Sequence, residues 1–346
     1  MKKTVFYISF LTILFITNGC TEEFNAASTE FEDAIVIEAS LTDQLAFQKV
    51  LLSRTFKIDD TQNQLEKVSG ANVRVVSNST TYTFSETTSG TYTSDIQFRA
   101  ELDTDHQLLV TTQSGKEYQS EVTQLRSETS NIENLYAVRE VNEDGFDGIS
   151  IYLDSYDPSG NSRYYTIDFE ETYRIIAPIQ LLGQTLEDRT CYNTINSTGR
   201  LLTNTTLSSE DRISRHLITF IPNEDLKMNN RYSILVRQYV NTESYYNFQK
   251  TLSELSSLES VFSPVQPGFV TGNIIATNNS NEKVLGSFEI ASVREKRIFV
   301  NRLDFFNFNN ENFRFCRQLP PDADPPRICT DCTVLGTRVK PNFWID

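Results

Sequence analysis

The feature that most constrains this chain is a series of short segments, between residues 34 and 125, in which apolar and polar residues alternate. Gly, Ser, Asn and Asp residues separate the segments, as turns require. Alternation with a period of two is typical of strands with one buried face. We predict seven strands, at 34–41, 48–55, 71–76, 81–84, 90–92, 108–112 and 117–122. Such a series folds as a β-sandwich, which we expect over residues 34–126.

Residues 127–346 are predicted to form a second, larger β-rich body. Alternation indicates further strands, at 148–154, 164–173, 217–221 and 231–239. One segment, 242–261, has a different period, with apolar residues three or four positions apart: Tyr245, Phe248, Leu252, Leu255 and Leu258. That spacing is typical of an amphipathic helix, with Thr242 as its N-cap and Glu243 in its first turn. We expect the helix to pack on its own sheet; docking of a partner is the alternative.

Within the first body, the segment 68–73, a polar hairpin and then the segment 90–92 are similar to transthyretin-like and carboxypeptidase-regulatory sandwiches. Such sandwiches are mostly non-catalytic spacers or docking modules. The expected fold class is therefore mostly β. An N-terminal Ig-like or transthyretin-like β-sandwich precedes a larger β-rich domain that has at least one amphipathic helix.

The first twenty residues have the composition of a lipoprotein signal. Lys2 and Lys3 precede an apolar stretch at 5–16, which has the length of a signal-peptide core and is short for a membrane span. Gly19 then precedes Cys20, and a small residue is what a lipoprotein peptidase accepts at that position. We predict a signal peptide at 1–19 and acylation of Cys20 with fatty acids such as palmitate. An ordinary cleaved signal is the alternative.

Acidic residues follow at once and indicate a tether. Thr21, Glu22, Glu23 and Phe24 resemble the surface-export signal of Bacteroidota lipoproteins, and residues 21–33 contain five acidic side chains and no basic one. We expect residues 20–33 to be extended, and the lipid anchor to hold the protein in the outer membrane, facing the cell exterior.

Charge excludes one class of partner. The chain has 31 Lys and Arg residues against 46 Asp and Glu residues, a net charge of −15. Removal of residues 1–19 takes away Lys2 and Lys3 and no acid, which leaves 29 basic side chains and a net charge of −17. An acidic surface of this kind repels nucleic acid, so we expect no nucleic-acid partner.

Four cysteines remain besides Cys20: Cys191, Cys316, Cys329 and Cys332. In an exported protein four cysteines predict two disulfides, and three pairings are possible. We favour Cys316 joined to one member of the C-x-x-C pair and Cys191 joined to the other, because no βαβ pattern surrounds that pair. A redox-active bridge within the pair and a four-thiolate zinc site are the alternatives.

Catalytic motifs are missing from the sequence, so we predict no enzyme, no catalytic residue, no cofactor and no metal. The two histidines, His106 and His216, are expected at the surface. Glu170 and Glu171 are adjacent on a predicted strand and point to opposite faces, so they cannot act as a paired acid and base. The acidic segment 142–148 has oxygen ligands that suit calcium but lacks EF-hand spacing, and we expect a plain β-turn there.

Two pairs of adjacent tyrosines are candidates for ligand contact: Tyr164, Tyr165, Tyr245 and Tyr246. Adjacent residues on a strand face opposite ways, so one member of a strand pair is expected at the surface. Packing in the core is the simpler interpretation, and stacking on a sugar or peptide is the alternative.

Several segments in a fixed order resemble the Bacteroidota outer-membrane lipoproteins grouped as domain of unknown function 4249. They are 68–71, 157–158, 164–165, 170–172, 236–239, 262–267, 272–274, 284–292 and 340–344. The resemblance covers nearly the whole chain and carries over no catalytic residue. It implies association with TonB-dependent outer-membrane transporters.

The leading hypothesis is a non-enzymatic, surface-exposed lipoprotein that acts as an accessory subunit of a TonB-dependent transporter, in substrate capture or gating. One alternative is a stand-alone lipoprotein that binds glycan or peptide. Another is a scaffold subunit of an outer-membrane assembly or secretion complex.

Overall fold

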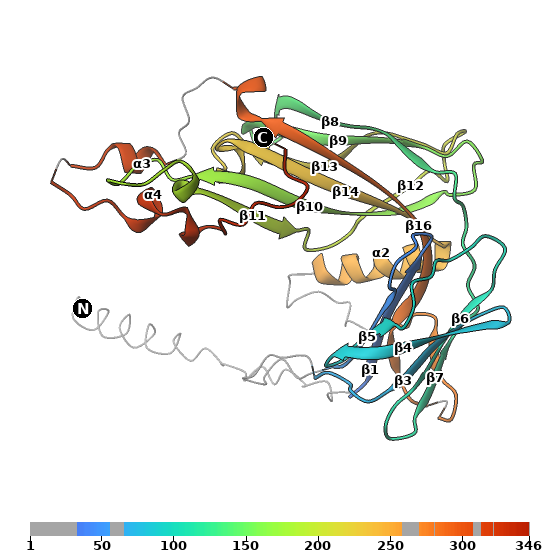
Figure 1. Cartoon of the computed structure of the whole chain (residues 1–346). Coiled ribbons are helices and arrows are strands. Elements are labelled where there is room, and N and C mark those ends of the chain that lie inside the picture. Colours follow the sequence, from blue (N-terminus) through green and yellow to red (C-terminus); the bar gives the residue numbers. More distant parts are fainter. Residues whose placement is uncertain are drawn as a thin grey trace, which may run out of the picture. The chain divides into compact units, whose positions relative to one another are not determined.

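The computed structural model describes residues 33–55, 66–257, 270–279, 281–306, 313–320 and 322–345 (Figure 1). Strands dominate these residues, and the longest helix among them is α2 (Glu243–Ser257). The expected fold class, mostly β with an amphipathic helix, is confirmed. Cys20 and the export segment Thr21, Glu22, Glu23 and Phe24 lie outside the described residues.

The first body contains a strand at each of the seven predicted places. They are β1 (Ile35–Thr42), β2 (Lys49–Arg54), β3 (Asn72–Ser77), β4 (Thr80–Thr88), β5 (Thr91–Ser94), β6 (His106–Thr111) and β7 (Glu117–Ser120). Two strands from far along the chain join them: β15 (Ile274–Ala276) pairs with β7, and β16 (Val284–Asn301) runs parallel to β1. The apolar core of this body therefore includes Phe288 and Ile290, well beyond the boundary expected at residue 126.

Two glycines let the returning chain pass close to itself. Gly286 has a φ of +90°, and a Cβ on Gly272 would lie 1.9 Å from the Gly286 carbonyl oxygen. Beside this crossing, the Asn273 side chain donates to the Phe288 carbonyl at 2.8 Å and accepts from the Phe288 N–H at 2.9 Å. The side chain of Asn273 thus pairs with β16 as a neighbouring strand would. The segments 272–274 and 284–292 meet here.

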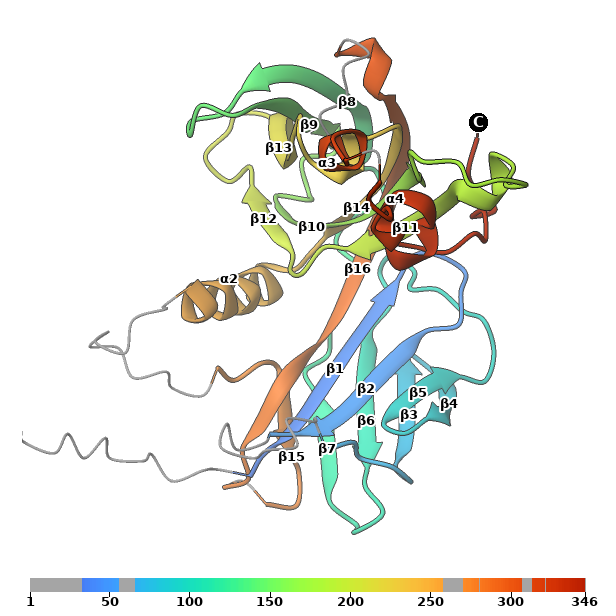
Figure 2. The ribbon, with the colours of Figure 1, turned by 90° about the vertical axis from the view of Figure 1, so that its left-hand side faces the viewer.

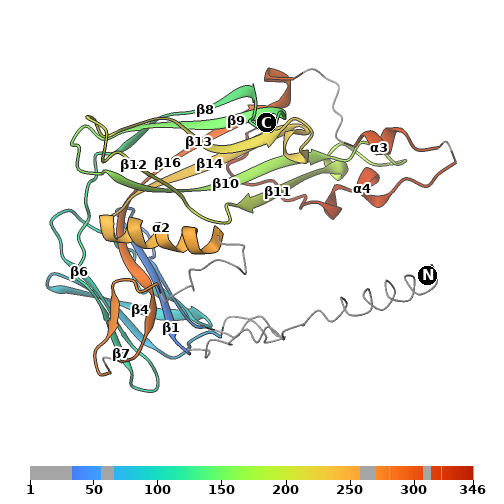
Figure 3. The same ribbon diagram turned by 180° about the vertical axis from the view of Figure 1, so that it is seen from behind.

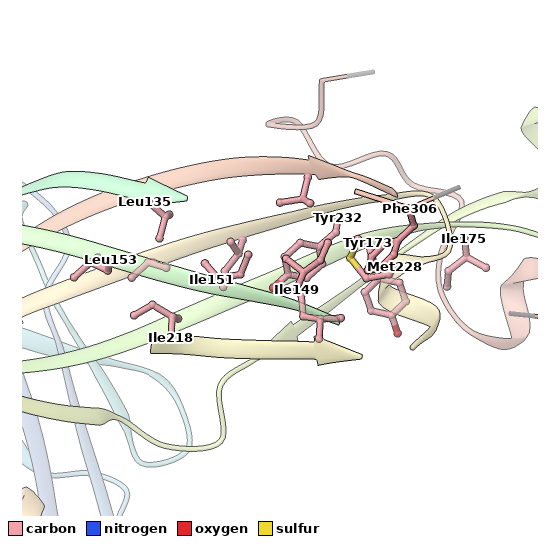
Figure 4. Close-up of a cluster of buried hydrophobic side chains, with 14 of the residues drawn as sticks. Leu135, Ile149, Ile151, Leu153, Tyr173, Ile175, Ile218, Met228, Tyr232 and Phe306 are labelled. Atoms are coloured by element: carbon pink, nitrogen blue, oxygen red, sulfur yellow. The ribbon is translucent and has the colours of Figure 1, made fainter. Parts of the chain in front are cut away.

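The second body packs a four-stranded part of the large sheet against a separate three-stranded sheet. The sheet order β11–β10–β14–β16 comprises β10 (Tyr164–Ile176), β11 (Thr190–Asn196), β14 (Arg231–Val240) and the second half of β16, with β12 (Leu201–Asn204) paired to β10. The smaller sheet comprises β8 (Asn131–Val141), β9 (Asp147–Tyr156) and β13 (Arg212–Pro222). Side chains such as Ile149, Ile151 and Tyr232 fill the space between the two sheets (Figure 4).

A buried polar cluster fixes the chain where it enters the second body. The Asp157 carboxylate accepts hydrogen bonds from hydroxyl or backbone groups of Ser127, Thr129, Ser159 and Ser162. Asp211 accepts from the backbone of Ser162 and Arg163 and from the hydroxyls of Tyr165 and Thr205. Because carboxylates only accept, hydroxyl-rich loops around two buried aspartates satisfy both partners.

Short helices complete the second body: η1 (Glu187–Arg189), η2 (Leu226–Met228), η3 (Arg302–Asp304), α3 (Arg314–Arg317), α4 (Arg327–Thr330) and η4 (Cys332–Val334). Near the C-terminus, Trp344 packs edge-on against Tyr192 and Phe299, and Arg297 lies over the Phe343 ring at 3.5 Å. The described residues from Ala34 onward belong to one compact unit.

Candidate ligand-binding grooves beside helix α2

Helix α2 begins where the sequence predicted. The Tyr245 N–H donates to the Thr242 hydroxyl at 3.2 Å, so Thr242 caps the helix, and Glu243 lies in the first turn. The helical prediction is confirmed over 243–257, and residues 258–261 lie outside the described part of the chain. The helix lies beside β1 and β16, as Figure 2 and Figure 3 show from two sides.

A buried carboxyl group lies beneath the first turn of α2. Glu289 of β16 accepts hydrogen bonds from the Thr242 N–H at 3.1 Å, the Thr242 hydroxyl at 3.3 Å and the Asn241 amide at 3.3 Å. Burial raises the pKa of Glu289 to about 8, although those hydrogen bonds oppose the change. Near neutral pH the group is therefore mostly an uncharged acid that joins α2 to the sheet.

The apolar stripe of α2 is only partly packed. Tyr246 makes the contact with the second body: its ring lies 5.3 Å from the Tyr164 ring, and its hydroxyl accepts from the Asn204 amide at 3.1 Å. Tyr245 and Phe248 are half-buried, and 38% of Leu252 is exposed. The helix thus packs on its own chain through Tyr246, while Tyr245, Phe248 and Leu252 of the predicted stripe border space that the described residues leave unfilled.

Two grooves occupy that space. One, with a volume of about 390 Å³, lies between α2 and strands β1 and β2; we call it the α2–β1 groove. The other, with a volume of about 340 Å³, lies between α2 and residues 270–273. Tyr245, Phe248 and Ser287 line both, so the two aromatic rings stand between the grooves. These volumes lie within the range of small-molecule sites.

Arg200 lies at the α2–β1 groove as well. Its Nη1 donates to the Tyr245 hydroxyl at 3.2 Å, and its guanidinium lies 4.4 Å from the centre of the Tyr239 ring. Sequence reasoning missed Arg200 and Glu289. The signal for Glu289 in the sequence was an acidic residue between the apolar Phe288 and Ile290.

Three of the four candidate tyrosines gather around α2. Tyr164 and Tyr165 point to opposite faces of β10, as a strand requires. Tyr165 is fully buried and donates to Asp211 at 2.8 Å, so it is a core residue. Tyr164 contacts α2, and hydrogen bonding to Glu243 raises the pKa of Tyr164. Of the four, Tyr245 lines the grooves.

The cysteines form Cys191–Cys332 and Cys316–Cys329 disulfides. This is one of the two cross-pairings that the sequence favoured, and it leaves no thiolate of these four for zinc and no bridge within the C-x-x-C pair. The bridges tie α3, α4 and η4 to β11. They are remote in sequence from α2 and stabilise the second body by restricting the unfolded chain.

One histidine prediction is wrong. His106 is only 1% exposed, because β6 turns His106 inward with Leu108 and Val110; its Nδ1 lies 2.8 Å from the Thr104 carbonyl oxygen. Burial lowers the pKa of His106 and of His216, which is half-buried in β13.

The acidic candidates are engaged in structural contacts. Glu170 pairs with Arg297 at 2.8 Å on the outer face, whereas buried Glu171 bonds to Tyr232 and Lys227. Residues 142–146 of the acidic segment form the turn between β8 and β9, and residues 147–148 begin β9. In the turn the Phe146 N–H donates to the Asn142 side chain at 2.8 Å. In the part of the chain that the structure describes, no three His, Cys, Asp or Glu side chains gather as a metal site.

The model of the family described as Domain of unknown function (DUF4249) matches residues 21–297. The chain belongs to this family. No curated protein compared with the chain matches it.

The DUF4249 match includes the first body, α2 and the Gly272–Gly286 crossing, and ends within β16. The disulfide-bonded C-terminal segment lies beyond the matched residues. None of the helices in the described ranges is long and apolar enough to cross a membrane.

Proposed function

We propose that this DUF4249 protein is a Bacteroidota lipoprotein, acylated at Cys20 and anchored in the outer membrane with its body facing the cell exterior. The two lysines, the apolar core of the signal and the Gly19–Cys20 step support acylation. The acidic residues Glu22 and Glu23 support export to the surface.

On that anchor the protein acts without catalysis, as an accessory subunit that captures substrate for a TonB-dependent transporter. The observation that carries this role is the pair of grooves at α2. Half-buried Tyr245 and Phe248, with polar groups around them, have the composition of a small-molecule binding site. The grooves lie against strands of a sheet that is continuous through both bodies, and this sheet forms the base of the site.

The test is recovery of the partner from native membranes. Tagged full-length protein, purified in mild detergent, is expected to bring down a β-barrel transporter that mass spectrometry identifies. The Cys20→Ser variant is the control, since it lacks the acylation site and should leave the membrane fraction and recover no barrel. Wild-type protein that is acylated and correctly located but recovers no transporter would refute the accessory role.

A second candidate function is a stand-alone glycan- or peptide-binding lipoprotein. It is favoured by one observation, that Tyr245 and Phe248 lie half-buried between the two grooves, as aromatic side chains that stack on a ligand do. Deletion of the co-purified transporter gene distinguishes the two. A stand-alone binder retains its ligand at the cell surface after the deletion, whereas an accessory subunit no longer supports uptake.

A further inference from the structure

The α2–β1 groove has one apolar side and one polar side. Tyr245, Phe248 and Leu252 of α2 form the apolar wall. The floor is the face of β1 and β2 opposite the apolar core, and it carries Glu38, Ser40 and Lys49 beside the exposed Leu51. A ligand that fills this groove therefore needs an apolar face and polar edges.

Two charged side chains of the floor are available to such a ligand. Among the described residues, Glu38 and Lys49 form no ion pair with each other or with any other side chain, and both side chains are exposed. The Ser40 hydroxyl is buried and has no hydrogen-bond partner within the same part of the chain. At one end, the Arg200 guanidinium is positioned by Tyr239 and Tyr245. The set contains both donors and acceptors.

Two other occupants fit less well. A lipid tail or an apolar helix would strip water from Glu38 and Lys49 without replacing their hydrogen bonds, which is costly. An extended peptide recognised by β-augmentation needs a free strand edge. Both β1 and β2 are internal strands: β1 pairs with β16 and β2, and β2 pairs with β1 and β5.

We propose that the α2–β1 groove binds an oligosaccharide. The C–H face of a sugar ring packs on Phe248 and Tyr245, sugar hydroxyls donate to Glu38, and others accept from Lys49 and Arg200. The groove volume of about 390 Å³ accommodates a short segment of such a chain. This inference rests on the proposed role in substrate capture and names the class of substrate.

The test uses the full-length acylated protein in detergent. Linear hexasaccharides of glucose, xylose, galactose, N-acetylglucosamine and galacturonic acid form the probe panel, and titration calorimetry measures the best binder. The Phe248→Ala and Glu38→Gln variants are each expected to weaken binding about tenfold or more. Phe146→Ala is the matched control, because Phe146 is 60% exposed in the β8–β9 turn and should leave the affinity unchanged.

Thermal unfolding of each variant establishes that it folds, and a half-exposed phenylalanine or an exposed glutamate tolerates these changes. The proposal is overturned if no hexasaccharide binds, or if Phe248→Ala and Glu38→Gln bind as tightly as wild type. It is also overturned if a tryptic digest of casein competes better than every sugar, which would indicate a peptide groove.

The partner experiment is separable from this one. Recovery of a transporter by a protein that binds no sugar overturns this inference and leaves the accessory role standing. Sugar binding that depends on Phe248, by a protein that recovers no transporter, supports the groove and overturns the accessory role instead.

Discussion

The cluster around Asp157 and the site beneath α2 both contain a carboxyl group that is 1% exposed. At Asp157, burial raises the pKa, but hydrogen bonds from Ser162, Thr129 and Ser159 together outweigh it and lower the pKa to about 2. At Glu289, burial again raises the pKa, and the hydrogen bonds from Thr242 and Asn241 leave it at about 8.

Both groups are covered from solvent, but Glu289 lies deeper in the molecule and accepts longer hydrogen bonds than Asp157. Burial therefore dominates at Glu289, whereas the donors dominate at Asp157, which keeps its charge. Asp157 is surrounded by short hydroxyl side chains on loops that wrap around it, so its charge is fully hydrogen-bonded. Glu289 meets only the end of one helix and the residue before it. The first site is therefore a charged anchor, whereas the second is a neutral contact near pH 7 that becomes costly when it ionises.

The largest expected effect comes from Glu289, which should make the protein less stable as the pH rises. Its folded pKa lies above its ordinary value of 4.5, so its contribution is complete below pH 4.5 and is lost as the pH rises to about 8. At about 1.4 kcal/mol per pKa unit, the free energy of unfolding should fall by about 3 to 4 kcal/mol across that range. Urea unfolding at a series of pH values measures this.

The Glu289→Gln variant provides the comparison, because glutamine stays neutral and still accepts from the Thr242 N–H. Its stability should change much less between pH 4.5 and 8 than that of the wild type. Parallel curves for the two proteins would show that Glu289 does not titrate in this range, and the contrast with Asp157 would then fail.

The next effect is the loss of the charged anchor. Asp157→Ala leaves several buried hydroxyls and one N–H without their acceptor, and we expect a loss of about 2 to 3 kcal/mol at pH 7 in urea unfolding. Because the folded pKa is lowered, this contribution is present above pH 3.8 and disappears as the pH falls to about 2. Asp144→Ala, an exposed aspartate in the β8–β9 turn, is the control and should change stability by less than about 0.5 kcal/mol.

A smaller change removes one donor from the neighbouring aspartate. Tyr165→Phe deletes the hydroxyl that donates to Asp211 at 2.8 Å, and a hydrogen bond to a charged group contributes about 1.5 kcal/mol. Tyr164→Phe is the comparison one residue away on the opposite face of β10: its hydroxyl bonds to Glu243 in contact with solvent, so its loss should change stability much less. Equal losses in the two variants would mean that the cluster is not held by its individual donors.

Local pattern predicted much of this fold. Alternation located the seven strands of the first body, and the spacing from Tyr245 to Leu255 located α2, because each depends on neighbours a few residues apart. Local pattern could not predict which distant segments pair with each other. Nothing local indicates that residues 284–291 lie parallel to β1, since that register depends on the crossing of Gly272 and Gly286.

The candidate site was predicted only in part. The tyrosine pairs drew attention to Tyr245, yet the same rule also selected Tyr165, which donates to Asp211 in the core. Glu38, Lys49 and Arg200 come from three separate segments and carry no motif, so only the tertiary structure brings them together. His106 was misassigned because a polar sequence around it hid the inward phase of β6.

The smallest expected effect tests the contact between Glu289 and α2 directly. Thr242→Ala removes both the cap of the Tyr245 N–H and one hydroxyl donor to Glu289, and a lost N-cap typically costs about 1 kcal/mol. Thr251→Ala changes the same residue type within the same helix, where the hydroxyl donates only to the Asn247 carbonyl, and should change stability by a few tenths of a kcal/mol. Urea unfolding at pH 6 compares the two.

With one donor fewer, the pKa of Glu289 should also rise, so the loss of stability in Thr242→Ala should extend to higher pH than in the wild type. A Thr242→Ala variant with unchanged stability and an unchanged pH profile would show that hydrogen-bond donors do not influence the pKa of Glu289, and the contrast with Asp157 would then rest on burial alone.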